Sequence, residues 1–262
     1  MAYLGGMMNR VTIILCFFSL TIFGETFDVE KLPELRTQQY PIGGLKKIVV
    51  FSLPRTGSSL VYNAFRYLFE AQENFSCSHN EFNLKCLVLK THRFDEIDRV
   101  KNSDMIYVVT MRNPIDSIIS HYRIYAHRIH QIREFVSSRI EMYMKFLHFY
   151  DELKKLGKNV IFLKYESFAN DLENLFEQIE SHFAIQIDQV DKTLIEKGYG
   201  RENVLSSTEP FSDFEGYLPI SGFHGSHIKA ESYTPPKELT YWIAILLEKA
   251  KPEFRKYGYF LE

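Results

Sequence analysis

The sequence predicts an α/β fold, a single domain with a central, mostly parallel sheet flanked by helices. Apolar segments of strand length alternate along the chain with longer amphipathic segments, which is typical of a parallel sheet with helices on both faces. Two of the apolar segments end abruptly in loops that lead directly into helical patterns. With 262 residues and 45% hydrophobic content, the chain can bury one full core. Its net charge of -2 argues against nucleic acid as a partner, because counterion release requires a strongly basic surface.

The first expected strand covers residues 47–52 and leads into a helix expected over about 59–71. Its consecutive apolar residues suit a strand buried on both faces. Pro54 and Gly57 interrupt the extended pattern, and Ser58 is expected to cap the helix.

The loop between this strand and helix has the layout of a phosphate cradle. The first turn of a helix leaves backbone amides unpaired, and its dipole favours an anion there, where Arg55 adds a full charge. The nucleoside triphosphatase P-loop requires a lysine after its second glycine, but here Gly57 is followed by Ser58 and Ser59. We therefore expect a different anion, although such loops also occur without any ligand.

A strand over 105–110 is followed by a second candidate anion site. Asn113 is a natural N-cap and Pro114 fits the first position of a helix expected over 115–127. Arg112 would then stand at the carboxyl end of the strand, where ligands of open α/β sheets bind, with Ser120 close by on the helix. An arginine that merely caps the sheet edge is the alternative.

Two further strands are expected over 86–90 and 160–164, the second followed by Tyr165. Additional helices are expected over the following ranges: 132–156, 171–184 and 236–257.

These segments together resemble the sulfotransferases that use 3'-phosphoadenosine 5'-phosphosulfate (PAPS), over roughly residues 45–262. The family's 5'-phosphosulfate loop is matched by Pro54, Arg55, Thr56, Gly57, Ser58 and Ser59. Its 3'-phosphate motif is matched by Arg112, Asn113, Pro114, Asp116 and Ser120. The run Lys90, Thr91, His92 is similar to the segment that carries the family's catalytic histidine, and Tyr165 corresponds to its adenine-contacting tyrosine. The resemblance implies a P-loop-like sulfotransferase fold.

The resemblance also implies roles for these residues. Arg55, with the amides of Thr56, Gly57 and Ser58, would stabilise charge on the departing phosphate oxygen. His92 would take the proton from the attacking hydroxyl, with Lys90 assisting by its charge, and the reaction requires no metal.

The chain departs from the family pattern in several places. Arg55 replaces the lysine usual in the cytosolic branch and resembles the tyrosylprotein branch, whose base is acidic, so Glu70 or Glu73 are reserve candidates for the base. The late Arg-Lys-Gly motif of the cytosolic branch is missing, and residues 219–229 are a candidate for its counterpart.

Two histidine-containing regions lie outside these motifs. The basic run 121–133 is interpreted as a solvated helix face, with a groove for an anionic acceptor as the alternative. The spacings of His127 with His130, and of His224 with His227, could suit a metal, but no third ligand is evident and we expect none.

The amino terminus bears on location. Residues 1–24, with an uncharged stretch after Arg10, have the pattern of a signal peptide or a short membrane anchor, followed by a linker over 25–44. A disulfide between Cys77 and Cys86 and a glycosylation sequon at Asn74 would also suit an oxidising compartment. We expect the secretory pathway, with the Golgi lumen as first choice or export as the alternative, and a cytoplasmic protein if the segment is not a working signal.

The sequence thus predicts transfer of a sulfuryl group from PAPS to a hydroxyl of an unidentified acceptor, which could be a carbohydrate, a protein tyrosine or a small alcohol. A catalytically inactive nucleotide-binding module is one alternative, and a divergent P-loop kinase is another. Nothing in the sequence indicates the oligomeric state.

Overall fold

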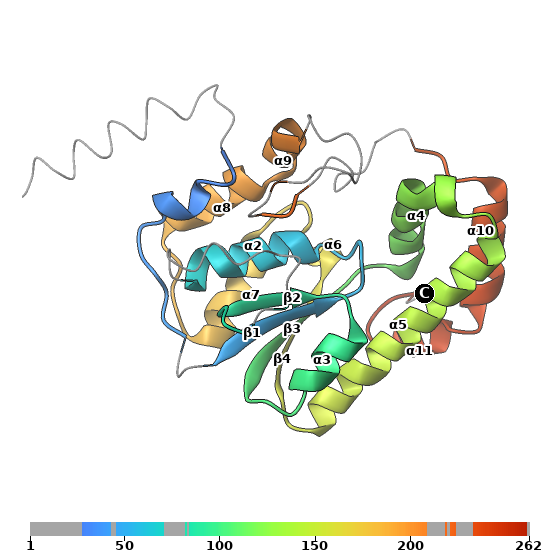
Figure 1. The fold of residues 1–262 in the computed structure, drawn as a ribbon, viewed down its shortest axis with the longest axis horizontal. Helices are drawn as coiled ribbons and strands as arrows, with labels where there is room; N and C mark the ends of the chain where they lie inside the picture. Colours follow the sequence, from blue (N-terminus) through green and yellow to red (C-terminus); the bar gives the residue numbers. More distant parts are fainter. Residues whose placement is uncertain are drawn as a thin grey trace, which may run out of the picture.

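A sheet of four parallel strands forms the centre of the molecule (Figure 1). The strands are β1 (Lys47–Ser52), β2 (Val88–Thr91), β3 (Met105–Met111) and β4 (Asn159–Lys164). Their spatial order is β2-β1-β3-β4. All four expected strands are confirmed, although β2 starts later than predicted. In this computed structural model the described residues are 28–42, 46–70, 82, 84–208, 218, 221–223 and 233–260.

The side chains of the sheet divide between two hydrophobic clusters, one on each face. Ile48 and Val50 of β1 belong to the first cluster, whereas Val49 and Phe51 belong to the second. Because successive residues of a strand point to opposite faces, a continuous apolar run is what burial on both sides requires. The predicted sheet with helices on both faces is therefore confirmed.

Three helices with a short 3-10 helix contribute to the first cluster. They are η1 (Leu32–Leu35), α2 (Ser58–Phe69), α7 (Glu173–Phe183) and α8 (Gln189–Tyr199). Two further helices, α6 (Tyr165–Phe168) and α9 (Arg201–Thr208), add Phe168 and Val204 to the same cluster.

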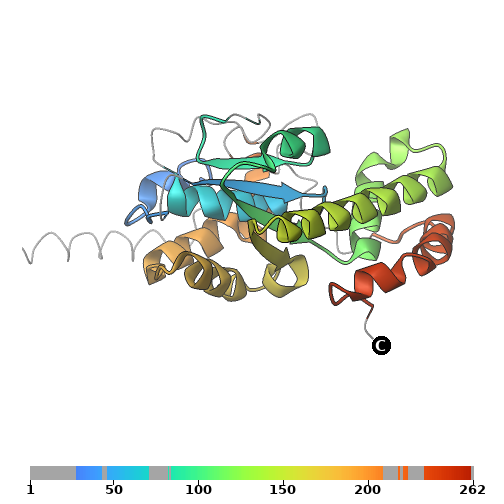
Figure 2. The same ribbon diagram turned by 90° about the horizontal axis from the view of Figure 1, so that it is seen from below.

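The second cluster involves the helices α3 (Phe94–Val100), α4 (Pro114–Tyr125), α5 (Ile132–Lys155), α10 (Lys237–Glu248) and α11 (Lys251–Arg255). Helix α5 extends from the side of the sheet to α4 and packs against α10 (Figures 1 and 2). A 3-10 turn, η3 (Ala126–Arg128), separates α4 from α5. The single helix predicted over 236–257 is in fact two helices, because α10 ends at Glu248 and Pro252 lies at the start of α11.

The amino-terminal segment 28–42 is held against the domain by a buried carboxylate, Asp191 of α8. This side chain is fully buried and accepts hydrogen bonds from the hydroxyls of Tyr40 and Tyr67, each at 2.7 Å. The Thr37 amide and hydroxyl also donate to it, at 2.9 and 2.7 Å. These four donors satisfy the hydrogen-bonding capacity of a carboxylate that water does not reach.

Within the part of the chain that the structure describes, no helix is both long enough and apolar enough to cross a membrane. The predicted signal or anchor segment 1–24 lies outside the described residues, as do Asn74, Cys77 and Glu73. Cys86 is disulfide-bonded. Its partner is not among the described residues, so the pairing with Cys77 stays a prediction.

Asp191→Ala is expected to lower the free energy of unfolding by about 3 kcal/mol or more, because it leaves several buried donors without an acceptor. Urea denaturation measures the loss. Asp98→Ala, which removes a half-exposed carboxylate of α3, should change stability by less than about 0.5 kcal/mol. Equal effects of the two substitutions would contradict the anchoring role of Asp191.

Candidate functional site

The carboxyl ends of all four strands lie at one edge of the sheet. The chain leaves β1 through α2 toward β2 on one side, and returns to β3 on the other side of β1. The edge between β1 and β3 is therefore the point where the strand order reverses, and open α/β sheets bind ligands there. Arg55 and Arg112, which follow these two strands, both lie at this point.

The loop 53–57 after β1 is tied to the neighbouring strand. The Thr56 hydroxyl donates to the Leu53 carbonyl oxygen at 2.8 Å and lies 2.8 Å from the Thr110 hydroxyl of β3. Arg55 has a φ of 72° and Gly57 a φ of 83°. A non-glycine residue in the left-handed region is unfavourable unless its surroundings hold it there, and such residues cluster at functional sites.

Gly57 is required by a close contact as well as by its backbone conformation. A Cβ atom at this position would lie 2.6 Å from Cδ2 of Tyr165 and 3.1 Å from the Phe168 ring. The N-cap of α2 is Gly57 itself, and it makes no side-chain cap. The prediction that Ser58 caps the helix is wrong, because the left-handed turn ends at Gly57 and Ser58 is already the first helical residue.

The two predicted anion-binding segments converge. The Nε of Arg55 donates to the Ser120 hydroxyl of α4 at 3.1 Å, so a loop residue reaches the helix that follows Arg112. The Arg112 guanidinium lies 4.5 Å from the centre of the Tyr165 ring, a distance typical of a cation–π contact. The Nε atom of Arg112 is buried and makes no hydrogen bond. A buried donor without a partner is unfavourable, and a ligand acceptor would relieve it.

A third arginine, Arg123, belongs to the same group; in the sequence it lies only in the basic run 121–133 and in neither anion-binding motif. Burial lowers the pKa of Arg55 to about 10, and the positive charges of Arg123 and Arg112 contribute to this shift. The pKa of Arg123 is also lowered, by burial first and by Arg112 as well. Arg123 follows Ser120 by three positions on a helix, so the two share a face. That spacing is the signal by which it could have been found.

Lys90, at the end of β2, adds a further amine to this edge. Its Nζ donates to the Ser59 hydroxyl at 2.7 Å and lies 6.0 Å from the centre of the Tyr62 ring. Burial, with the nearby charge of Arg55, lowers the pKa of Lys90 to about 7. Near neutral pH its ammonium is therefore easily deprotonated while no anion is bound.

His92 is held in one orientation by β1. Its Nδ1 donates to the Ser52 carbonyl oxygen at 2.7 Å. A neutral imidazole bound in this way carries its ring proton on Nδ1. The bond thus fixes both the orientation and the tautomer of a neutral His92 ring.

The prediction of Glu70 as a reserve candidate for the base is wrong. Its carboxylate is fully buried at the opposite edge of the sheet, where it accepts hydrogen bonds from the amides of Leu87 and Val88 at 3.0 and 3.2 Å. Burial raises its pKa, but the group joins α2 to the start of β2 and has no access to the carboxyl edge.

The turn that carries Arg112 is ordered by its neighbours. The Asn113 side chain accepts a hydrogen bond from the Ile115 amide at 2.9 Å, so the predicted N-cap is confirmed, and Pro114 is the first helical residue. The Asn113 amide donates to Glu166 at 2.6 Å, and the Tyr259 hydroxyl donates to the same carboxylate at 3.3 Å. Glu166 therefore links the turn after β3 to the end of β4 and to the carboxyl-terminal segment.

Other predicted features are only partly placed. Of residues 219–229, the structure describes 221–223, where the Asn63 side chain of α2 donates to the Ser221 carbonyl oxygen at 2.8 Å. His121 is 8% exposed, so the interpretation of 121–133 as a solvated helix face is wrong at its start. Among the described residues, no three His, Cys, Asp or Glu side chains are grouped to hold a metal ion. His224 and His227 lie outside those residues.

No protein-family model and no curated protein matches this chain. Among solved structures, the chain is similar to mouse sulfotransferase SULT7A1 complexed with PAP, with a TM-score of 0.49 and 14% sequence identity. The similarity covers 87% of this chain and 90% of the mouse chain. At this level of likeness nothing about the activity of the present chain follows from it.

Gly57→Ala is expected to destabilise the protein and to displace Tyr165, because it adds a steric clash to the strain of a left-handed alanine. The matched control is Gly157→Ala, since Gly157 has a φ of 65° but nothing within 4 Å of a Cβ. The control should lose about 1–2 kcal/mol through backbone strain alone. Urea denaturation measures both, and an equal loss would show that the contact with Tyr165 is unimportant.

Proposed function

We propose that this protein is a PAPS-dependent sulfotransferase that transfers a sulfuryl group to a hydroxyl of its acceptor. The observation that carries the proposal is the convergence of Arg55, Arg112 and Arg123 at the edge between β1 and β3. Three guanidinium groups repel one another, so the arrangement is best satisfied by a ligand with several negative charges. Backbone amides at the start of α2 add donors to the same place.

The residues fit the two charged ends of a bisphosphorylated adenosine. The loop amides of Thr56, Gly57 and Ser58, with Arg55 and Ser59, would hold the 5' end. The unpaired Arg112 Nε and the Ser120 hydroxyl would hold the 3'-phosphate. Tyr165, which packs beside Gly57 and over Arg112, would stack on the adenine.

The chemistry assigned to the chain is electrostatic stabilisation and proton transfer. PAPS supplies the sulfuryl group, whose bond to the phosphate oxygen breaks as a bond to the acceptor oxygen forms. Arg55 remains protonated and stabilises the negative charge on the phosphate oxygen that departs. His92 accepts the hydroxyl proton at Nε2, while its Nδ1–H stays bonded to Ser52. Lys90, which donates to Ser59, adds positive charge beside the loop.

An inactive nucleotide-binding module would keep the arginines but would not need His92 in a defined tautomer. A P-loop kinase would need the lysine that Ser58 replaces. The proposed acceptor remains a carbohydrate, a protein tyrosine or a small alcohol. Action in the secretory pathway also remains a proposal, which depends on residues 1–24.

The direct test is transfer of labelled sulfate from PAPS to a panel of sugars, tyrosine peptides and alcohols. Adenosine 3',5'-bisphosphate binding is measured in parallel by calorimetry. Binding of the bisphosphate without transfer to any acceptor would favour the inactive module. Binding of ATP with magnesium but not of the bisphosphate would favour the kinase.

Substitutions should separate the proposed roles. Arg112→Ala should weaken bisphosphate binding about 10- to 100-fold, since it removes a charged hydrogen-bond donor. Arg55→Ala should lower kcat about 10²- to 10³-fold, and His92→Ala about 10²- to 10⁴-fold with little change in bisphosphate affinity. Arg99→Ala, which removes an exposed cation of α3, is the control for net charge. Full activity of the Arg55 and His92 variants would refute these assignments.

Bisphosphate affinity should fall as the pH rises above about 7, because of Lys90. Burial lowers the pKa of the free Lys90 to about 7, whereas a nearby anion raises it again, so binding above this pH takes up a proton. Calorimetry in buffers of different ionisation enthalpy measures that uptake. In Lys90→Met the uptake should disappear and leave only the ligand's own phosphate titration near pH 6. An unchanged proton uptake in that variant would contradict the assignment to Lys90.

A further inference from the structure

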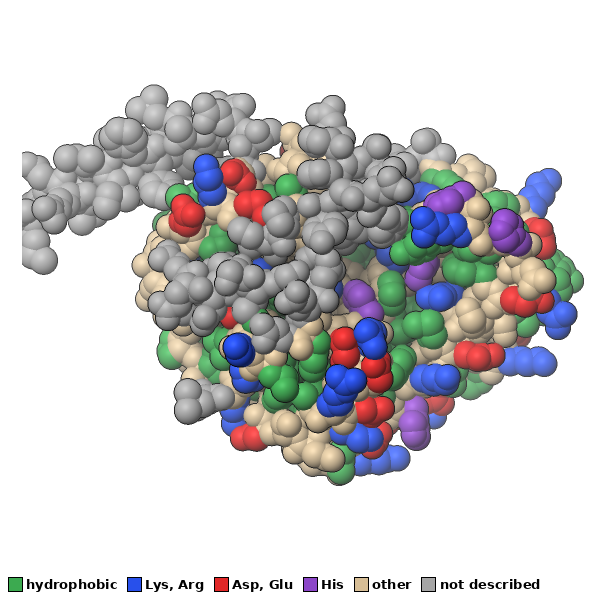
Figure 3. Space-filling model, in the orientation of Figure 1, with side chains coloured by type: hydrophobic (Ala, Val, Ile, Leu, Met, Phe, Trp, Pro, Cys, Tyr) green, Lys and Arg blue, Asp and Glu red, His purple; other side chains and the backbone are tan. Residues whose placement is uncertain are grey.

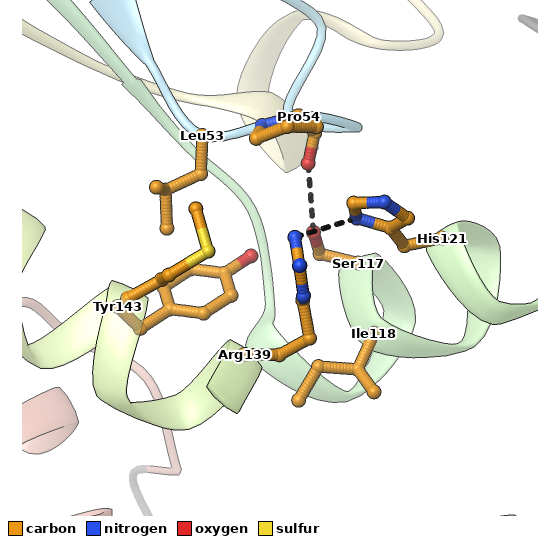
Figure 4. A pocket seen from close by; sticks show the side chains of 8 residues that line it. Leu53, Pro54, Ser117, Ile118, His121, Arg139 and Tyr143 are labelled. Carbon is orange, nitrogen blue, oxygen red and sulfur yellow. Dashed lines mark hydrogen bonds between the residues drawn. The ribbon is translucent and has the colours of Figure 1, made fainter. Parts of the chain in front are cut away.

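A small pocket lies between α4 and α5, next to the start of the loop 53–57 (Figure 4). It has apolar walls, to which Ile118 and Met142 contribute, and several polar groups. We call it the α4–α5 pocket. Its lining includes Leu53 and Pro54 before the loop, Ser117 and His121 of α4, and Arg139 and Tyr143 of α5. The space would hold about one water molecule or a single oxygen atom of a larger group.

The Tyr143 hydroxyl is the first unusual feature of this pocket. The side chain is 2% exposed, and its hydroxyl makes no hydrogen bond. Burial raises the pKa of Tyr143, and a contact with the Ser117 hydroxyl, longer than a normal hydrogen bond, opposes that shift; the Ser117 hydroxyl donates to the Pro54 carbonyl oxygen at 3.3 Å. In Figure 4 the Tyr143 hydroxyl points toward the Arg139 guanidinium. A buried hydroxyl without a partner weakens the fold, which suggests that it serves another purpose.

Arg139 is the second unusual feature. Its Nε is buried without a hydrogen bond, and its Nη1 lies 3.4 Å from Nδ1 of His121. The guanidinium also lies 5.5 Å from the centre of the Phe135 ring. Within the described residues, no ion pair joins Arg139 to a carboxylate. A partly buried guanidinium of this kind still has donors to offer an anion.

His121 completes the polar lining. Because arginine can only donate, Nδ1 of His121 must accept from Arg139, which leaves the ring proton on Nε2. Burial lowers the pKa of His121 to about 3, and the positive charges of Arg139 and Arg55 contribute. The pocket therefore presents guanidinium and hydroxyl donors and has no acidic residue among the described residues of its lining. Such a set of donors favours an oxygen with negative charge.

The position of the pocket relates it to the acceptor side of the proposed site. Leu53 of its lining directly follows Ser52, whose carbonyl oxygen accepts the hydrogen bond from His92, and Pro54 directly precedes Arg55. His92 is the residue beside which the acceptor hydroxyl would lie, whereas the nucleotide phosphates are assigned to the loop 53–57 and to Arg112. Basic and histidine side chains are also visible on the surface around the α4 end of the molecule (Figure 3).

We infer that the α4–α5 pocket receives a carboxylate oxygen of the acceptor, so that the acceptor is a hydroxyl-bearing acid. The inference rests on the proposed function, since it names the class of acceptor for the same site. Arg139 and Tyr143 bind the carboxylate, and Arg139 in turn is positioned by His121.

The test compares probes that differ in the carboxylate. The pairs are 4-hydroxyphenylacetate with 4-hydroxyphenylethanol, and phenyl β-glucuronide with phenyl β-glucoside, each titrated by calorimetry into the full chain with adenosine 3',5'-bisphosphate. The acid of at least one pair should bind about tenfold more tightly than its neutral partner, as one charge-assisted hydrogen bond allows. Arg139→Gln and Tyr143→Phe should each reduce this preference. Lys145→Gln, which removes an exposed charge from the same helix, should retain it.

A second measurement separates a binding role from a structural one. Tyr143→Phe should raise the Tm of the ligand-free protein, because it removes a buried hydroxyl that has no partner. A lower Tm would mean that the hydroxyl supports the fold, and it would overturn the inference. Equal binding of acid and neutral probes, or binding of none of them, would also overturn it.

The outcomes for the inference and for the proposed function are distinct. A preference for acids that depends on Arg139, without sulfuryl transfer to any acceptor, would support carboxylate binding in the α4–α5 pocket and refute the proposed sulfotransferase activity. Transfer to acidic and neutral acceptors with equal efficiency would support the activity and refute carboxylate binding in the pocket.

Discussion

The close packing of Tyr165 against the backbone of Gly57 determines the geometry of the carboxyl edge. This contact joins the loop after β1 to the residue that follows β4, across the end of β3. Arg112 contacts the same tyrosine, because its guanidinium lies over the Tyr165 ring. The glycine therefore does more than permit a turn. It allows the Tyr165 ring to approach the loop closely. Arg55 and Arg112, which belong to separate βα units, then lie near each other.

The candidate site groups several positive charges that repel one another. Contacts elsewhere in the fold must offset this repulsion. Burial, with a smaller contribution from repulsion between like charges, lowers the pKa of Arg55, of Arg123 and of Lys90. The loop 53–57 and the start of α4 are secured by other contacts: the Asn113 cap, the Glu166 carboxylate and the hydroxyl contact between Thr56 and Thr110. These contacts stabilise the segments around the site, whereas the grouped positive charges within it are themselves unfavourable, as is common at sites with perturbed pKa values.

The strands and the start of α4 could be predicted from local sequence, whereas contacts between distant segments could not. Apolar runs located the four strands, and the Asn-Pro pair located the start of α4, because these signals depend on a few adjacent residues. The hydrogen bonds from Tyr40 and Tyr67 to Asp191 join residues far apart in the chain, and no local sequence pattern predicts them. A charge run such as 121–133 predicts a solvated face, yet packing against α5 buries His121. Residue type alone makes Glu70 a candidate base, whereas its position at the far edge of the sheet follows only from the fold. The roles assigned to Arg55, His92 and Tyr165 remain predictions.

The anchoring of segment 28–42 by Asp191 also determines how the domain can be attached to something else. Because η1 contacts α8, Asp28 and the rest of segment 28–42 lie on the side of α8, whereas α4 and α10 lie toward the other end of the long axis (Figure 1). A fusion partner, an immobilising tag or a surface linker joined ahead of residue 28 would therefore leave the basic α4 end facing outward. The domain could be presented on a support by its amino-terminal side with that end accessible to large molecules in solution.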